Sequence, residues 1–198
     1  MVDASRARND SGHYDPRAMA ISERELLEQA QAGDLDAFAE FMRTFERRIR
    51  AVCYRLLDDG RDVDEAVQDT FVQAWRNLGR FRGDAAPYTW LYRIAVNEAL
   101  MRRRRKTLPT SELQETIVSG GEDAFAAADA RAFLVERLRA LPLEYRSAVV
   151  LRDVEGLSNG EVAEVLEISL AAAKSRIHRG RMQLRTDLEQ WESSQAEP

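Results

Sequence analysis

Helical periodicity between residues 61 and 106 constrains this chain more than any other feature. Apolar side chains recur there every three or four residues, which is typical of one buried face of an α-helix. The residues of this stripe are Val63, Ala66, Val67, Thr70, Phe71, Ala74 and Leu78. Pro87 is well placed to begin a second helix, which opens with aromatic residues and closes with the basic run at 102–106. The stretch therefore predicts two helices joined by a short loop that contains Gly83.

The face of the first helix that lies opposite the apolar stripe is polar and mostly acidic. It carries Asp64, Glu65, Gln68, Asp69 and Val72. A cation site is one alternative for the acids, which also include Asp62, but helical spacing spreads their carboxylates around the axis. We therefore interpret this face as a docking surface for another protein.

The second helix carries large side chains around nearly its whole circumference. Tyr88, Trp90 and Tyr92 exceed what one core face requires, and aromatic rings can stack on unpaired bases, each recovering about 1–3 kcal/mol. The preceding loop could form a pocket for an extruded base, and Arg93 with the basic run could hold the nucleic-acid backbone. A core role for Trp90 and Leu91 is the competing interpretation.

Similar periodicity extends through most of the chain and predicts an all-α protein. Ser22 and Glu25 form a capping-box pattern that starts a short helix, and a long apolar stripe follows from Leu35 to Leu57. Prolines, glycines and acids then interrupt the pattern after the basic run, which indicates a flexible linker. We expect two small helical domains, with a disordered N-terminal tail at 1–21, a first domain at 22–106, the linker at 107–128, a second domain at 129–190 and a C-terminal tail at 191–198.

The second domain ends in a helix-turn-helix pattern. Ser158 and Glu161 form a capping box, a tight turn follows, and Ser169 is a suitable N-cap for a basic helix from Leu170 to Leu184. Two helices joined by so short a turn, the second of them basic, are typical of a DNA-reading module. The candidates for phosphate and base contacts on its outer face are Ala172, Lys174, Ser175, Arg176, Arg179 and Arg181. A plain helical hairpin with a solvated basic face is the alternative.

Net charge alone does not suggest a nucleic-acid-binding protein, since the formal value is −5 at pH 7. The charges are segregated, however. Residues 76–106 carry nine basic residues against Asp84 and Glu98, and residues 168–185 carry five basic residues and no acid. Local charge decides where a polyanion binds, so both segments are candidates for DNA contact.

Several classes of protein are excluded by what the sequence lacks. Cys53 is the only cysteine and falls on an apolar helical face, so we expect a buried thiol and neither a disulfide nor a cysteine-rich zinc site. No apolar run is long enough to cross a membrane and no signal peptide is recognisable, which predicts a cytoplasmic protein without membrane insertion. His13 and His178 lie far apart, and no phosphate-binding loop or metal-binding spacing occurs. We therefore expect neither an enzyme nor a bound cofactor or metal.

Two groups of residues form motifs that are separated by the predicted linker. The first comprises Gln68-Asp69-Thr70-Phe71, Trp75, Phe81-Arg82-Gly83-Asp84 and Tyr88-Thr89-Trp90-Leu91-Tyr92-Arg93-Ile94-Ala95. The second comprises Leu141-Pro142, Tyr145-Arg146, Val149-Val150-Leu151, Glu155-Gly156-Leu157-Ser158 and Lys174-Ser175-Arg176-Ile177-His178-Arg179-Gly180-Arg181. Together they resemble two conserved segments of the extracytoplasmic-function (ECF) sigma factors, the small promoter-specificity subunits of bacterial RNA polymerase. The resemblance covers about residues 22–190.

This resemblance implies a sigma factor that is not itself an enzyme. Its partners would be core RNA polymerase, promoter DNA and an anti-sigma factor. The acidic face of the first helix would bind the polymerase, and the helix from Leu170 would read the minus-thirty-five promoter element. The first domain would recognise and melt the minus-ten element through Asp84, Ala85, Ala86, Tyr88, Trp90, Arg93 and Asn97.

The turn before the last helix departs from the family pattern. Relatives often have a proline-valine-glycine-threonine run there, whereas this chain has Ser169-Leu170-Ala171-Ala172. The bases that this helix prefers in DNA therefore cannot be copied from a relative. Two other functions stay open from the sequence: a transcriptional regulator that binds duplex operators, and an adaptor protein. An acidic docking helix beside an aromatic helix favours the sigma factor, because an ordinary regulator needs neither.

Overall fold

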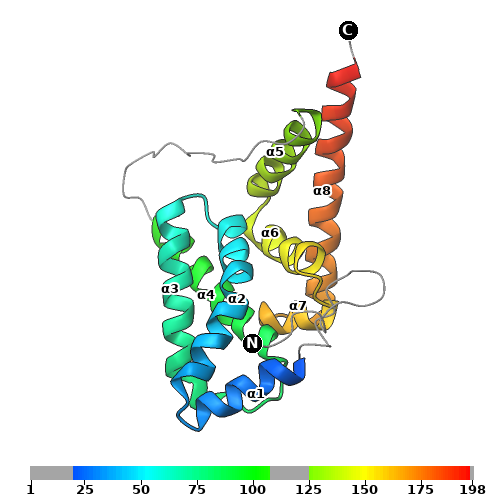
Figure 1. Cartoon of the computed structure of the whole chain (residues 1–198). Helices are drawn as coiled ribbons and strands as arrows, with labels where there is room; N and C mark the ends of the chain where they lie inside the picture. Colours follow the sequence, from blue (N-terminus) through cyan, green and yellow to red (C-terminus); the bar gives the residue numbers. More distant parts are fainter. Residues whose placement is uncertain (1–19, 108–124, 197–198) are drawn as a thin grey trace, which may run out of the picture.

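The computed structural model describes residues 20–107 and 125–196, and the regular structure within these ranges is entirely helical (Figure 1). The first domain comprises α1 (Ala20–Gln31), α2 (Leu35–Leu56), α3 (Gly60–Asn77), the 3₁₀ turn η2 (Leu78–Arg80) and α4 (Pro87–Thr107). The second comprises α5 (Phe125–Ala140), α6 (Leu143–Val149), the π-helical turn η3 (Val150–Val154), α7 (Asn159–Val165) and α8 (Leu170–Ala196). The prediction of an all-α fold with two helical domains is confirmed for the described residues.

The core of the first domain is built around α2. Asp34 caps this helix by accepting hydrogen bonds from the backbone amides of Asp36 at 2.9 Å and Ala37 at 3.1 Å, which satisfies two donors that a helix start leaves unpaired. The predicted apolar stripe packs against α1, α3 and α4. The buried residues of α2 are Ala37, Phe38, Phe41, Phe45, Ile49, Val52, Cys53 and Leu56, whereas Leu35, at the start of the predicted stripe, is exposed. The prediction of a buried thiol is confirmed, and burial raises the pKa of Cys53 to about 12.

The second domain contains the predicted helix-turn-helix, formed by α7 and α8. Ser158 Oγ accepts a hydrogen bond from the amide of Glu161 at 3.2 Å, and Glu161 Oε2 accepts one from the amide of Ser158 at 2.7 Å. This reciprocal capping box starts α7. Ser169 Oγ accepts a hydrogen bond from the amide of Ala172 at 3.2 Å and caps α8. Local side-chain caps therefore define both helices, as the sequence predicts.

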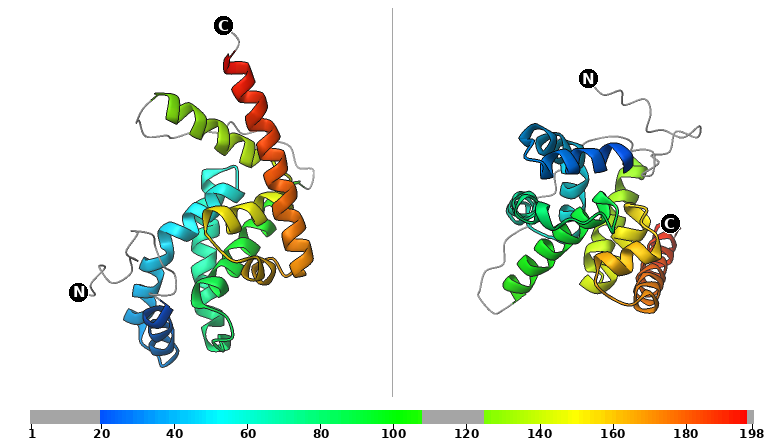
Figure 2. Two further views of the ribbon diagram at one scale, coloured as in Figure 1. Left: turned by 90° about the vertical axis from the view of Figure 1, so that its right-hand side faces the viewer. Right: turned by 90° about the horizontal axis from the view of Figure 1, so that it is seen from below.

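Helix α8 packs across α6 and then extends beyond the rest of the domain beside α5 (Figure 2). At Gly180 the approach of α6 is so close that an added Cβ would lie 2.6 Å from Cγ2 of Val149. Farther along, the Trp191 ring stacks on Phe133 of α5, with centroids 5.1 Å apart and 23° between the planes. The prediction that this helix ends at Leu184 is wrong, because it runs through most of the predicted C-terminal tail.

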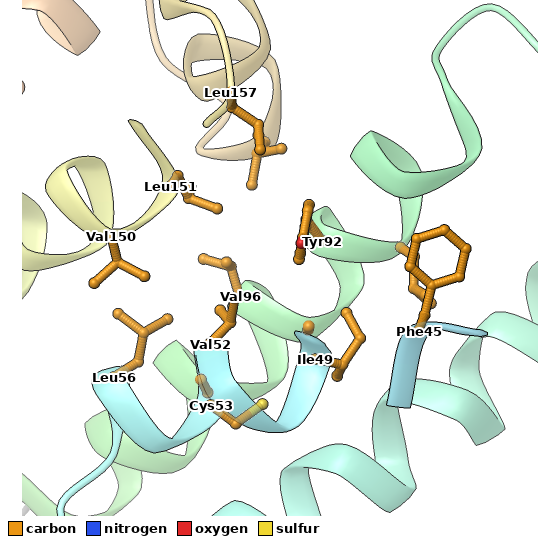
Figure 3. Packing of buried hydrophobic residues seen from close by; sticks show 14 of the residues in the cluster. Phe45, Ile49, Val52, Cys53, Leu56, Tyr92, Val96, Val150, Leu151 and Leu157 are labelled. Carbon is orange, nitrogen blue, oxygen red and sulfur yellow. The ribbon is translucent and has the colours of Figure 1, made fainter. Parts of the chain in front are cut away.

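The two domains pack against each other, and their apolar cores are continuous (Figure 3). Helices α2 and α4 of the first domain lie against α6, η3 and α7 of the second. We call this contact the seam. The buried residues labelled at the seam are Val52, Leu56, Tyr92 and Val96 from the first domain, and Val150, Leu151 and Leu157 from the second. Apolar burial of this kind contributes roughly 25 cal/mol per Å², so the seam stabilises the contact between the domains.

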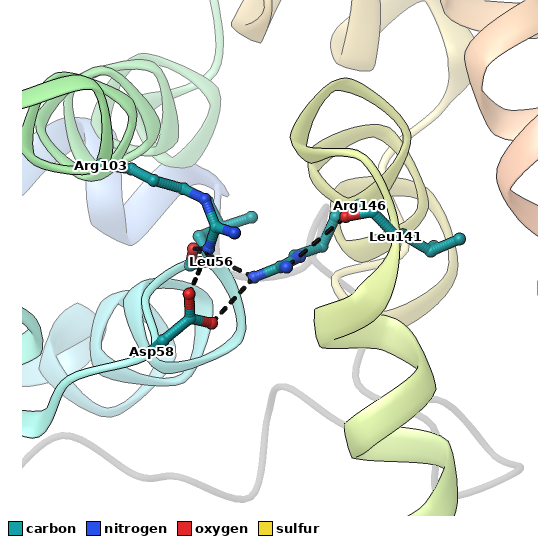
Figure 4. A network of polar contacts seen from close by, with 5 residues as sticks. All are labelled: Leu56, Asp58, Arg103, Leu141 and Arg146. Atoms are coloured by element: carbon teal, nitrogen blue, oxygen red, sulfur yellow. Dashed lines mark hydrogen bonds and ion pairs between the residues drawn. The ribbon is translucent and has the colours of Figure 1, made fainter. Parts of the chain in front are cut away.

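Arg146 of α6 is a fully buried polar side chain at one end of the seam (Figure 4). Its guanidinium donates to Asp58 Oδ1 at 3.3 Å, to the carbonyl oxygen of Leu56 at 3.4 Å and to that of Leu141 at 3.5 Å. Arg103 of α4 shares two of these partners, at 2.6 Å from Asp58 Oδ2 and 3.3 Å from the Leu56 carbonyl oxygen. The carboxyl end of a helix carries partial negative charge, so arginines from both domains neutralise the end of α2.

Two further predicted boundaries are wrong. Helix α1 begins at Ala20, two residues before the predicted start at Ser22. Helix α5 begins at Phe125, so residues 125–128 of the predicted linker are helical. The rest of that linker from residue 108, and the predicted N-terminal tail as far as residue 19, lie outside the described residues.

Candidate polymerase and nucleic-acid interfaces

The candidate docking residues lie together on the solvent side of α3. All are exposed except one half-buried acid, and they comprise Asp64, Glu65, Gln68, Asp69 and Val72. Three of them are already engaged within the domain. Arg102 of α4 donates to Glu65 Oε2 at 2.6 Å and also bonds Asp69, while Arg50 of α2 bonds Asp64. The face is therefore less negative than its sequence suggests, because arginines of the same chain neutralise three of its carboxylates.

An apolar groove of about 780 Å³ runs beside this face, between α2 and α3. Its lining includes Phe38, Phe71 and Trp75, whose indole is 42% exposed and lies 4.9 Å from the Phe38 ring between centroids. Gln68 and Val72 belong to both the acidic face and the groove. The sequence interpretation missed the groove, although an aromatic residue outside the apolar stripe of α3, such as Trp75, is a signal that could have indicated it.

The loop before α4 turns at Gly83, whose φ of +76° lies in the left-handed region that favours glycine. Arg24 of α1 donates to the carbonyl oxygen of Gly83 at 3.1 Å and ties the turn to the first helix. Asp84 is exposed, and Ala85 and Ala86 are half-buried. The three candidate loop residues are therefore accessible on a braced turn.

Helix α4 divides its large side chains between the core and the surface. Leu91 and Tyr92 are fully buried, so Leu91 is a core residue, and the expectation that Tyr92 offers an exposed ring is wrong. Trp90 is half-buried, with its ring centroid 5.1 Å from that of Phe81. Asn97 is exposed. The helix surface thus offers fewer aromatic rings than its sequence implies.

Tyr88 and Arg93 lie on the side of α4 that faces the second domain. Tyr88 donates its hydroxyl hydrogen to Glu161 of α7, and burial, then this hydrogen bond, raise the pKa of Tyr88 to about 12. Arg93 Nη2 donates to the carbonyl oxygen of Glu164 at 3.2 Å and lies 3.4 Å from its Oε1. These two of the candidate minus-ten residues therefore contact acidic side chains of α7.

The candidate duplex-reading residues lie in the first part of α8, outside its buried stripe. Four are exposed and two, Ala172 and Arg176, are half-buried; the exposed ones are Lys174, Ser175, Arg179 and Arg181. The arginines contact residues of their own domain. Arg176 Nη2 lies 3.5 Å from Glu144 Oε2, Arg179 Nη1 donates to the Tyr145 hydroxyl at 3.3 Å, and Arg181 Nε donates to Asp153 Oδ2 at 3.0 Å. These contacts hold the basic side chains in place without covering them.

Among the residues that the structure describes, no three histidine, cysteine, aspartate or glutamate side chains are grouped as a metal site would require. None of the described helices combines the length and the apolar character that a membrane-spanning segment needs.

Comparison with known families identifies two segments. The family described as Sigma-70 region 2 matches residues 41–108, and the family described as Sigma-70, region 4 matches residues 134–184. The ECF RNA polymerase sigma-E factor of Escherichia coli (strain K12) is 34% identical over 176 residues, which span 81% of this chain and 91% of that protein. The chain belongs to the ECF sigma factors. We accordingly call the two matched segments region 2 and region 4.

Further relatives agree with this assignment. The ECF sigma factor SigW of Bacillus subtilis (strain 168) is 32% identical over 184 residues, which span 86% of this chain and 98% of SigW. The structure of CnrH, solved with the cytosolic domain of CnrY, matches at a TM-score of 0.66 and 29% identity, over 85% of this chain and 97% of that one. RpoE of Bartonella quintana, solved with the anti-sigma factor NepR, has the same fold at a TM-score of 0.65 and 22% identity, over 78% of this chain and 98% of that one.

Family membership fixes the general function of the chain. As a sigma factor, it directs promoter-specific initiation of transcription by RNA polymerase. Sigma factors are regulatory DNA-binding subunits and not enzymes.

Proposed function

We propose that this sigma factor recruits core RNA polymerase to promoters with two elements, a minus-thirty-five element read as duplex and a minus-ten element that is opened. The observation that carries the proposal is the presence of two distinct surfaces suited to DNA. Region 4 presents the exposed basic residues of α8, and region 2 presents the loop and the aromatic start of α4. A regulator that binds only duplex operators would need the first surface alone.

In this proposal, core polymerase docks on the outer face of α3 and the groove beside it. Gln68 and Val72 are exposed and border both surfaces, so a polar and an apolar contact lie next to each other. Trp75 adds a ring that a partner can bury, and such aromatic anchors often dominate the free energy of binding. The acidic residues then contribute mainly to orientation, since internal arginines already neutralise them.

The first turns of α8 are assigned to the duplex. The N-terminal part of the second helix of a helix-turn-helix enters the major groove, which favours Ser175 and Arg176 for base contacts. Arg176 must leave Glu144 to grip a guanine, but a partly exposed ion pair of this kind contributes little stability. Lys174 and Arg181 are assigned to phosphates, which position the domain without reading sequence.

The start of α4 is assigned to the opened strand. Tyr88 and Trp90 can stack on unpaired bases, each offsetting about 1–3 kcal/mol of the stacking lost on opening. Residues 84–86 offer a turn at which an extruded base can be read. Arg93 and Asn97 are four residues apart and therefore share one side of the helix, where they can contact the backbone and edges of the strand.

We also propose that an anti-sigma factor binds this chain and that the chain acts in the cytoplasm, together with RNA polymerase. CnrH, which is 29% identical, was solved in complex with another protein, the cytosolic domain of CnrY. Binding and base stacking perform the proposed function, so it requires no cofactor.

Run-off transcription with purified core polymerase tests the proposal. The full-length chain should produce specific transcripts from promoter fragments selected from the genome that encodes it, and core polymerase alone should not. Specific duplex binding without any transcript would support an ordinary regulator and contradict the proposal.

A further inference from the structure

Helix α1 braces the loop that carries candidate minus-ten residues. Gln31 is the last residue of α1, and its side-chain amide donates from Nε2 to the carbonyl oxygens of Leu78 and Phe81, each at 2.8 Å. Arg24, earlier in the same helix, donates from Nη2 to the carbonyl oxygen of Gly83 at 3.1 Å. Two side chains of α1 therefore hold three points of the chain between α3 and α4.

The helix that makes these contacts is itself fixed in the core of region 2. Leu27 and Ala30 are buried, and α1 packs against α2. Arg24 and Gln31 are seven residues apart and therefore lie on the same face of the helix. Both residues are exposed, so neither side chain fills the core, and substitutions at either position should cost the fold little stability.

The turn at Gly83 meets the brace at close range. With a φ of +76°, Gly83 has a backbone conformation that other residues rarely adopt, and an added Cβ would lie 2.7 Å from Nη1 of Arg24. Glycine thus lets the backbone approach the guanidinium closely enough to accept its hydrogen bond. The candidate residues 84–86 follow directly, so the orientation of this turn sets the direction in which they leave it.

The brace also reaches an aromatic residue that is proposed to stack on the opened strand. The carbonyl of Phe81 accepts from Gln31, and the ring of Phe81 lies 5.1 Å from that of Trp90 between centroids. Arg82, the next residue of the loop, lies with its Nε 3.2 Å from Oδ2 of Asp84. A shift of the loop would therefore move the contacts of both Trp90 and Asp84.

We infer that Gln31 and Arg24 are positioning residues for recognition of the minus-ten element. They act through the loop at 78–86 and not by contact with a base. A loop that is already held in its binding conformation loses less conformational freedom when the strand arrives, so base preference at this element depends on α1. The inference rests on the proposed role of the loop and of α4, and it adds a determinant of specificity that lies outside the strand-binding surface.

The test is a ratio of affinities, measured on the complex of the full-length chain with core polymerase. The probes are fluorescent single strands that carry the minus-ten element of a promoter transcribed by the wild type, either unchanged or with one base replaced at a time. Gln31→Met keeps the length of the side chain and removes its N–H donors. Because a neutral hydrogen bond shifts an equilibrium by about two- to tenfold, discrimination between the probes should fall about fivefold. The affinities for core polymerase and for a duplex minus-thirty-five element should not change.

Two further variants separate positioning from a general loss of stability. Gln31→Arg restores N–H donors on a side chain long enough to reach the same carbonyl oxygens, so it should recover the discrimination of the wild type. Its added charge acts on all probes alike and cancels from the ratio. Gln29→Met makes the matched change at an exposed position on another side of α1, and it should discriminate as the wild type does.

Equal discrimination by Gln31→Met and the wild type would overturn the inference. A loss that Gln31→Arg does not recover, or that Gln29→Met shares, would overturn it as well. So would a Gln31→Met complex that binds every probe more weakly at an unchanged ratio, because the loop would then support affinity without setting base preference. The proposed function fails by a different result, namely a wild-type chain that directs no transcription with core polymerase.

Discussion

Arg102, near the end of α4, donates a hydrogen bond to Glu65 of α3 at 2.6 Å and bonds Asp69 one helical turn farther along. The arginine side chain is 15% exposed, whereas the two carboxylates are about half exposed. The acidic face of α3 is thus also a brace between α3 and α4. Reversing the charge of either acid would disturb this packing together with any docking surface, so polymerase binding is better tested at a neighbouring residue.

Gln68 is that residue, because it is exposed and borders the groove without an ion pair to α4. Gln68→Lys should weaken binding to core polymerase about tenfold or more, which corresponds to roughly 1.4 kcal/mol, while the free energy of unfolding stays nearly unchanged. The measurement is equilibrium binding to fluorescently labelled core polymerase. Gln29→Lys, the same change at an exposed position of α1, is the control. Equal affinities of the two variants would contradict the docking assignment.

Gly180 should be required for the stability of region 4. An added Cβ would lie 2.6 Å from Val149 Cγ2 and 3.3 Å from Tyr145 Cβ, so Gly180→Ala should lower the free energy of unfolding by about 1–3 kcal/mol, even though alanine favours a helix. Gly60→Ala, at the open start of α3 where no atom would lie within 4 Å, should be neutral or stabilising. Urea unfolding of both variants distinguishes the two; similar stabilities would contradict the close contact of α6 and α8.

Glu23 of α1 should make stability depend on pH. It is 1% exposed, neither carboxylate oxygen has a hydrogen-bond partner among the described residues, and burial raises its pKa to about 7 against an opposing effect of Arg48. A raised carboxyl pKa means that stability present below the ordinary pKa near 4.5 is lost as pH rises toward 7.

Glu23→Gln should therefore be more stable than the wild type at pH 8, by on the order of 3 kcal/mol, and this advantage should shrink toward pH 5. Urea unfolding of both proteins at several pH values measures the difference. An advantage that does not change with pH would show that the carboxyl does not titrate in this range.

The two kinds of contact proposed for α8 predict different behaviour of two variants. Arg176→Ala should flatten the preference at one base pair of the minus-thirty-five element, a loss of about 1–3 kcal/mol of discrimination. Lys174→Ala should weaken all duplexes alike and reduce the salt slope of binding by about 0.9. Binding of the full-length variants to a duplex library at two salt concentrations measures both effects. If Arg176→Ala weakens every duplex equally, base reading passes to Ser175 or Arg179.

The helices of the helix-turn-helix could be predicted from sequence because their signals are local. Ser158, Glu161 and Ser169 cap the helices within three residues of themselves, and such short-range hydrogen bonds leave a readable pattern. The apolar stripes of α2 and α3 are readable for the same reason. Neither requires knowledge of distant parts of the chain.

The seam could not be predicted in this way, because its determinants lie far apart in sequence. Arg146 looks like an exposed residue until the end of α2, almost ninety residues earlier, supplies its acceptors. Tyr92 looks like a surface ring until Glu155 meets its hydroxyl. The full length of α8 was hidden similarly, since Trp191 finds its partner Phe133 only in the folded chain.

Promoter opening is the most direct test of the account, and permanganate reactivity of unpaired thymines in the minus-ten element measures it. With core polymerase and a fully paired promoter, the wild type and Tyr88→Phe should give strong reactivity, because both retain a ring that can stack. Tyr88→Ala should give weak reactivity that recovers on a promoter whose minus-ten region is already mismatched. Equal reactivity of Tyr88→Ala and the wild type on paired DNA would contradict the assignment of α4 to the opened strand.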